Sequence, residues 1–232
     1  GLSTLDVWDD KLVALGSEII DARLRLASDL HQPLIDAYSA IAGADHRPEI
    51  EWALSVSGGD PEEGEASATG DGAVARSRIT ELFRAALQAK RAQEIDRGLT
   101  LVGPHRDDLT LRVRGLPVKG YASHGESWSV ALALRLASAE LLRAESPAGD
   151  PVLILDDVFA ELDTDRRRRL ASLTAGYEQV VVTAAVEEDI PDALHRHVVR
   201  IAAGTISDER GAGHEGAGHD SKGDDNKGDD GE

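Results

Sequence analysis

The 232-residue sequence contains no cysteine and no methionine. Without cysteine the chain can form neither a disulfide bond nor a thiolate metal site, which suits a reducing compartment. Without methionine it lacks an initiator residue, so we interpret it as a processed product or, preferably, a piece of a longer protein. No apolar run approaches the roughly 20 residues of a membrane span, and no signal-peptide pattern opens the chain. These absences exclude a disulfide-stabilised scaffold and favour a protein without membrane contact.

Positive charge is scarce, because 43 acidic residues face only 25 basic ones and the net charge is -18. This balance argues against a protein that grips nucleic acid by bulk electrostatics. Nine acidic and three basic residues lie between positions 207 and 232. We therefore expect 206–232 to be a disordered acidic tail. The rest of the chain is still acidic, so any contact with DNA needs a local basic patch or a surface shared with a partner.

The first 98 residues are expected to form a helical lobe or arm. Apolar residues from Leu5 to Leu26 alternate at spacings of three and four, which is typical of a heptad seam on a long helix. Such a helix suits an ordinary bundle, or an arm that projects from a head domain. Further features of this lobe are a break or kink at Pro33, a helix end at Gly43, a strand over 50–56, a flexible loop over 57–73 and a second helix ending near Gly98.

A polar turn, Gly103-Pro-His-Arg-Asp-Asp108, follows a predicted strand over 99–102. His105 and Arg106 lie just past the strand end, where they are candidate site residues. The alternative is a polar turn with an internal Arg–Asp pair. Alternating apolar residues from Leu109 to Val113 then predict a β-hairpin.

An acidic pair, Asp156 and Asp157, follows the apolar run 152–155. The run is too short for a helix and predicts a strand that is buried on both faces of a parallel sheet. Open α/β sheets place ligands at the carboxyl ends of their strands. Nucleoside triphosphatases use such carboxylates to hold Mg²⁺ and to orient the attacking water. A solvated Asp-Asp turn is the alternative.

A signature turn, Ser123-His-Gly-Glu126, comes directly before a strongly apolar helix. Helix N-termini with a nearby glycine are ready anion sites, although Ser123 can equally be a simple N-cap. Further along, a helix over 164–173 carries four arginines, 166–169, which we interpret as a solvated face. Strands over 179–183 and 197–201, with a helix start at 189–192, complete the chain. His195 and His197 lack a third ligand, so we discount a metal site there.

Three motifs occur in one order: the signature turn, Leu153-Ile-Leu-Asp-Asp157 and the stretch Ala160-Glu-Leu-Asp163. Together they resemble the second half of an ABC-type ATPase head of the SMC/Rad50/RecF class, an α/β fold. More closely, the segments 100–108 and 154–163 resemble the RecF family of DNA replication and repair proteins. The resemblance covers roughly residues 1–205, and it implies a head part over 99–205 beside the helical second lobe.

The resemblance implies a role for each matching residue. Asp156 matches the Walker B aspartate that helps to hold Mg²⁺, and Asp157 stands where a catalytic carboxylate polarises the attacking water. The signature residues Ser123, Gly125 and Glu126 would contact ATP bound to the opposite subunit of an ATP-dependent homodimer. The D-loop residues that would cross the dimer interface are Ala160, Glu161, Leu162 and Asp163.

The resemblance also implies partners and a location. RecF-like proteins are expected in the cytoplasm with the nucleoid, at single-strand gaps and at junctions of single-stranded and duplex DNA. There they would help to load recombinase together with RecO and RecR. An SMC- or Rad50-like head and a non-enzymatic interaction module that keeps the fold are the alternatives.

Two departures from the family pattern stand out. No Gly-x-x-x-x-Gly-Lys-Ser/Thr loop occurs in the sequence. In many relatives a histidine follows the strand after the D-loop, whereas here that strand ends in Thr183, which makes Thr183 a candidate contact to the γ-phosphate.

We predict that the purified 232-residue chain alone does not hydrolyse ATP, because it lacks a phosphate-cradling loop. Phosphate release in the presence of Mg-ATP measures this directly. Turnover that disappears in an Asp157→Asn variant would contradict the prediction.

Overall fold

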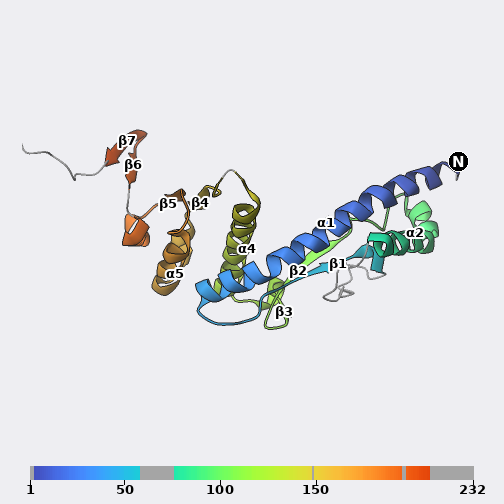
Figure 1. Ribbon diagram of the computed structural model, residues 1–232, viewed down its shortest axis with the longest axis horizontal. Helices are drawn as coiled ribbons and strands as arrows, with labels where there is room; N and C mark the ends of the chain where they lie inside the picture. The colour runs from blue at the N-terminus through green and yellow to red at the C-terminus, as the bar shows by residue number, and fades with distance from the viewer. Residues whose placement is uncertain (1–2, 58–75, 148, 195–196, 210–232) are drawn as a thin grey trace, which may run out of the picture. The chain divides into compact units, whose positions relative to one another are not determined.

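The computed structural model of the protein describes residues 3–57, 76–147, 149–194 and 197–209 (Figure 1). By contacts, Gly1–Pro191 forms one compact unit and Asp192–Glu232 a second. The loop expected after Ser57 and the tail from residue 210 onward lie outside the described residues. The division into 1–98 and 99–205 stays a prediction.

Helix α1 (Ser3–Ala42) is a single helix of 40 residues. Pro33 lies inside it and does not break it, so of the expected break or kink the break is excluded. A proline inside a helix costs about 3 kcal/mol, which the buried side chains of Leu30, Leu34 and Tyr38 offset by packing. The helix ends before Gly43, whose φ of +69° is the left-handed conformation common after a helix end.

The face of α1 that packs in the core is not the predicted heptad seam. Val13 and Ile20 are buried against α2 (Arg76–Arg97), whose core residues are Ile79, Phe83 and Leu87. Gly16 lets α2 approach, because a Cβ there would lie 2.5 Å from a ring carbon of Phe83. The seam residues Trp8, Leu15, Ile19 and Leu26 are exposed instead. Periodicity identified one apolar stripe, and the fold covers a different one, which contains Val13 and Ile20.

Strands β1 (Glu49–Ala53), β2 (Asp108–Val113) and β3 (Leu116–Pro117) form an antiparallel sheet in that order. The predicted hairpin is confirmed, and its turn at Arg114 and Gly115 has positive φ at both residues. This geometry matches the twist of the strands it joins. The strand predicted over 50–56 stops at Ala53, because a buried 3₁₀ turn, η1 (Ser55–Ser57), follows.

The strand predicted over 99–102 does not form. The Leu101 N–H donates to the Glu94 carboxylate at 2.7 Å, and the Gly103 N–H donates to the Ser55 hydroxyl at 2.9 Å. Side chains therefore satisfy this backbone where a neighbouring strand would otherwise do so. Val102 is buried in the core with α1 and α2.

A short turn, α3 (Val118–Tyr121), leads into α4 (His124–Glu145), which packs beside the second half of α1 (Figure 1). Small buried residues on α4, among them Ser129, Ala133 and Ala137, allow this close contact. Strand β4 (Leu153–Asp156) continues through η3 (Val158–Glu161) and α5 (Thr164–Thr174) to β5 (Val180–Thr183), which lies parallel to β4.

Strand β4 is not buried on both faces, which corrects the sequence prediction. Leu155 is 6% exposed whereas Ile154 is 69% exposed. The described sheet has only these two strands, and its face with Ile154 and Val181 is exposed.

The second unit contains η5 (Asp192–Leu194) and a hairpin of β6 (Val198–Ala202) and β7 (Thr205–Glu209). Strand β7 covers residues that we expected at the start of the tail. The helix expected from 189–192 is replaced by 3₁₀ turns, η5 and the preceding η4 (Glu187–Asp189). Among the described helices, none combines the length and apolar character needed to cross a membrane.

We predict that Phe83→Ala lowers the free energy of unfolding by about 3–5 kcal/mol, because it leaves a cavity between α1 and α2. Chemical denaturation measures the change. Leu26→Ala, on the exposed face of α1, is the matched control and should change stability by less than about 1 kcal/mol. Equal losses in the two variants would contradict the assigned core.

Candidate functional site

The acidic pair lies at the carboxyl end of β4, beside the end of the parallel strand β5. Asp156 is opposite Thr183 in the register, and its carboxylate accepts a hydrogen bond from the Thr183 hydroxyl. The Asp157 N–H donates to the Thr183 carbonyl oxygen at 3.1 Å. The structure thus brings together three of the residues expected at the site.

Asp157 adopts a left-handed backbone conformation, with a φ of +52°. Most side chains avoid this region, and aspartate tolerates it better than most. The turn directs the chain from β4 into η3 immediately after the acidic pair. Both carboxylates remain exposed to solvent and are therefore accessible to a ligand.

These donors fit a magnesium ion better than a softer metal. Two carboxylates and a hydroxyl supply only oxygen atoms, and Mg²⁺ is commonly held by one or two carboxylates together with substrate phosphates and water. Within the described ranges no group of three or more His, Cys, Asp or Glu side chains could hold a metal ion. An ion here would therefore need further oxygen ligands from a phosphate group or from water.

The signature turn is a capping box at the start of α4. The Glu126 N–H donates to the Ser123 hydroxyl at 3.3 Å, and the Ser123 N–H donates to the Glu126 carboxylate at 2.9 Å. The N-cap interpretation of Ser123 is therefore confirmed. The hydrogen bond from the Ser123 backbone N–H, followed by that from the Ser123 side chain, lowers the pKa of the Glu126 carboxyl.

Arg114, which the sequence analysis did not single out, forms an ion pair with Glu126. Its own N–H donates to the His46 carbonyl oxygen at 2.7 Å, and the His46 ring lies 3.1 Å from the Tyr38 hydroxyl. Tyr38 belongs to α1 and is fully buried. The signature turn is thereby attached to the C-terminal end of α1.

The D-loop residues divide into outward and inward side chains. Ala160 and Glu161 are exposed, whereas Leu162 is 4% exposed and belongs to the core. Asp163 caps α5 by accepting from the Arg166 N–H at 2.9 Å, and this bond lowers its pKa. Only part of the D-loop is therefore free to contact a second molecule.

The signature turn and the D-loop lie next to each other. The His124 ring nitrogen is 3.3 Å from the Glu161 carboxylate. Arg166 reaches the same turn, because its guanidinium lies 2.8 Å from the position that a Cβ on Gly125 would occupy. Since the D-loop follows the acidic pair directly in the chain, these three motifs form one continuous region.

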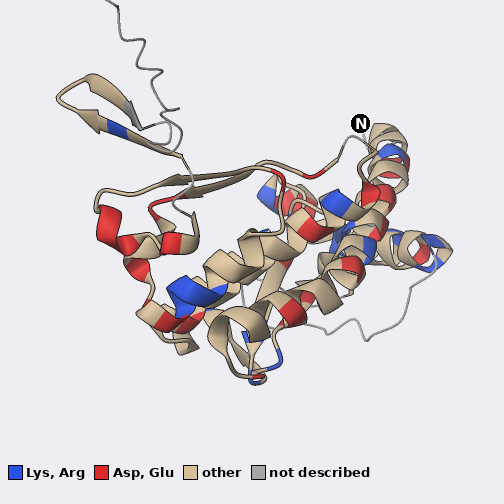
Figure 2. Cartoon of the chain, turned by 60° about the vertical axis from the view of Figure 1, so that its left-hand side comes forward, with Lys and Arg blue, Asp and Glu red and all other residues tan. Residues whose placement is uncertain are grey.

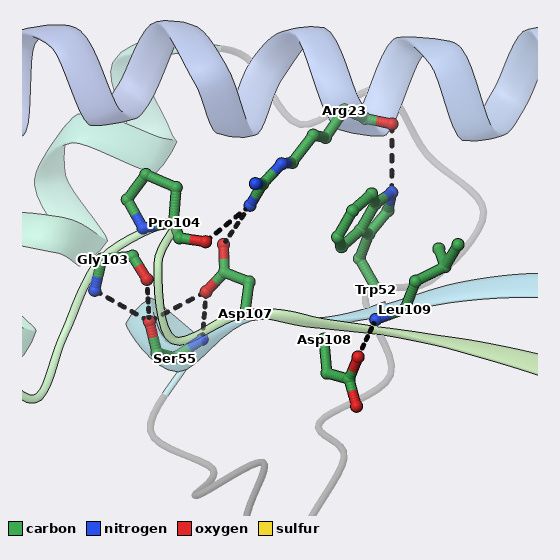
Figure 3. A network of polar contacts seen from close by, with 8 residues as sticks. All are labelled: Arg23, Trp52, Ser55, Gly103, Pro104, Asp107, Asp108 and Leu109. Carbon is green, nitrogen blue, oxygen red and sulfur yellow. Dashed lines mark hydrogen bonds and ion pairs between the residues drawn. The ribbon is translucent and has the colours of Figure 1, made fainter.

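The polar turn Gly103–Asp108 lies against the middle of α1 (Figure 3). The Arg23 guanidinium donates to the Pro104 carbonyl oxygen at 2.7 Å and lies 3.7 Å from the Asp107 carboxylate. His105 and Arg106 face the Thr100 carbonyl oxygen, at 3.4 and 3.0 Å. These contacts join the turn to α1 and to the segment that precedes it.

Asp107 is the buried charge of the polar turn. Its Oδ1 accepts from the Ser55 N–H and hydroxyl, each at 2.9 Å, and its Oδ2 has no hydrogen-bond partner among the described residues. Burial raises the pKa of this carboxyl, although the Ser55 bonds and Arg23 act in the opposite direction. The described Arg–Asp pair joins Asp107 to Arg23 of α1 and is therefore not the pair internal to the turn that the sequence suggested.

No protein-family model matches the chain. The DNA replication and repair protein RecF of Leifsonia xyli subsp. xyli is 58% identical over 205 residues, which are 88% of this chain and 53% of that protein. RecF of Streptomyces avermitilis is 52% identical over 207 residues, which are 88% and 51%.

A solved structure described as the recombination mediator protein RecF with ATPrS, in the RecFOR pathway, has the same fold. It superposes with a TM-score of 0.69 at 25% identity and covers 90% of this chain and 51% of that one. The fold is therefore that of part of an ABC-type ATPase head. The predicted resemblance to RecF is confirmed: the chain is homologous to RecF and spans about half the length of the curated relatives it matches.

We predict that Asp107→Asn gains stability relative to the unsubstituted protein as pH rises from below the ordinary Asp pKa of 3.8 toward neutrality. A folded-state pKa above the unfolded value means that the unfolded chain loses its proton first, so stability falls with rising pH. The asparagine cannot ionise and lacks this slope. Chemical denaturation across the pH range measures the difference, and a difference that does not change with pH would contradict the assignment.

Proposed function

We propose that this chain supplies the acidic pair, signature turn and D-loop of a RecF-type ATPase that acts in DNA replication and repair. The observation that carries the proposal is the end of β4, where Asp156 and Asp157 meet Thr183 beside the D-loop. The homology to proteins named for DNA replication and repair supports it.

Each residue has a defined task in this proposal. Asp156 would hold Mg²⁺, which when bound neutralises the charge of the nucleotide phosphates. Asp157 would orient the attacking water, and Thr183 would hold the Asp156 carboxylate in place through its hydroxyl. Phosphoryl transfer depends mainly on positioning and charge neutralisation, so carboxylates held at a strand end suit it.

The signature turn would act on ATP bound to a second subunit. The N-terminus of α4 offers backbone N–H groups and a positive dipole end to a phosphate. Ser123, Gly125 and Glu126 would make this contact, while Ala160 and Glu161 of the D-loop would meet the partner. ATP binding would thus hold two heads together, and hydrolysis would release them.

The DNA target would be a single-strand gap or a junction of single-stranded and duplex DNA in the cytoplasmic nucleoid, where RecO and RecR would assist recombinase loading. Acidic residues are spread along the described helices (Figure 2). A DNA surface would therefore depend on the local basic residues or on the assembled dimer.

We predict that Asp157→Asn in the native full-length protein lowers ATP turnover by about 10²–10⁴-fold, because the attacking water loses its carboxylate. Association in Mg-ATP should persist, since binding does not require this group. Phosphate release and sedimentation velocity measure the two effects.

The matched control is Asp165→Asn, an exposed carboxylate that pairs only with Arg168 in the described contacts. It should change neither quantity. If Asp157→Asn hydrolyses ATP at the unsubstituted rate, or if the unsubstituted protein never associates in Mg-ATP, the proposed function is wrong.

A further inference from the structure

Two arginines of α5 occupy space that glycines of other elements leave free. Arg166 and Arg169 are three positions apart and so lie on one face of the helix. A Cβ on Gly125 of the signature turn would crowd Arg166 Nη1 at 2.8 Å. A Cβ on Gly43 at the end of α1 would collide with the Arg169 guanidinium.

Arg169 is bound to the last turn of α1. Its Nη1 donates to the Ile41 carbonyl oxygen at 3.3 Å. The final carbonyl groups of a helix have no partner within the helix and carry partial negative charge. A guanidinium is therefore a favourable cap at this position, and it ties α5 to α1.

Arg166, on the same helix, lies against the signature turn. Its guanidinium lies 3.6 Å from the Asp163 carboxylate as well as beside Gly125. Its charge, with those of Glu126 and Arg114, acts on the Tyr38 hydroxyl of α1, whose pKa is raised chiefly by burial. The end of α1, the signature turn and the D-loop thus meet around one face of α5.

We propose that Arg166 and Arg169 are positioning residues that fix the signature turn relative to the end of α1. The inference rests on the proposed function, in which the signature turn contacts ATP on a second subunit. A turn held by α1 and α5 is in place before that contact forms, so both arginines strengthen the association of two heads. A movement of the end of α1 would therefore also change the position of the signature turn.

Arg168 provides the matched control on the same helix. Its side chain is 70% exposed and pairs only with Asp165, one turn earlier, at 3.0 Å in the described contacts. Arg168→Gln removes the same charge as Arg166→Gln or Arg169→Gln without touching α1 or the signature turn.

The test uses the native full-length protein and two measurements. Hydrogen–deuterium exchange without nucleotide follows the amides of the signature turn and the start of α4. We expect amide exchange there to be about tenfold faster in Arg166→Gln and in Arg169→Gln. Arg168→Gln should leave the exchange rate unchanged. Sedimentation velocity in Mg-ATP should show association weakened about tenfold in the first two variants only.

Arg166→Lys keeps the charge but not the planar fork, so it should give an intermediate effect and guards against a variant that fails to fold. Unchanged exchange in the Arg166 and Arg169 variants would overturn the inference, as would faster exchange with normal association. Faster exchange in a protein whose unsubstituted form never associates in Mg-ATP would support the positioning and reject the proposed function alone.

Discussion

The packing of α1 against its neighbours is the constraint on which the rest of the larger unit depends. The first half of this helix shares a core with α2, and its second half packs against α4 and α5. Small residues make both contacts close: Gly16 admits Phe83, and the alanines of α4 admit α1. Without such contacts the ends of a 40-residue helix would fray, because helices gain most of their stability from tertiary packing.

The arginines of this acidic chain mainly hold structural elements in place rather than forming a basic surface. Arg23 holds the polar turn against α1, Arg114 holds the signature turn, and Arg167 lies 2.9 Å from Asp189. The four successive arginines of α5, a continuous basic stretch in Figure 2, therefore point to different partners, and only Arg168 faces solvent. The interpretation of this run as a solvated face was wrong for the other three.

The sequence predicted the parts of the site that depend on local chemistry. Ser123 and Glu126 at the spacing of a capping box identify the start of α4, and an apolar run before two aspartates identifies β4. It could not show that Val102 lies in irregular backbone, because the bonds that replace a strand there come from Ser55 and Glu94. Arg114 and Arg166 were missed as site residues for a similar reason. The partners of Arg114 belong to other elements, and Arg166 lies in the space beside Gly125, which no sequence pattern shows.

The exposed face of the sheet formed by β4 and β5 is relevant to the proposed site. A parallel pair of strands is normally enclosed by further strands and helices, yet Ile154 and Val181 remain exposed. The chain also spans only about half the length of its RecF relatives and has no phosphate-cradling loop. Carboxylates can orient water and hold a metal ion only after the phosphates are fixed in place. Under the proposed function, the acidic pair and the signature turn would therefore be parts of a site that becomes complete only when other protein surface encloses the nucleotide.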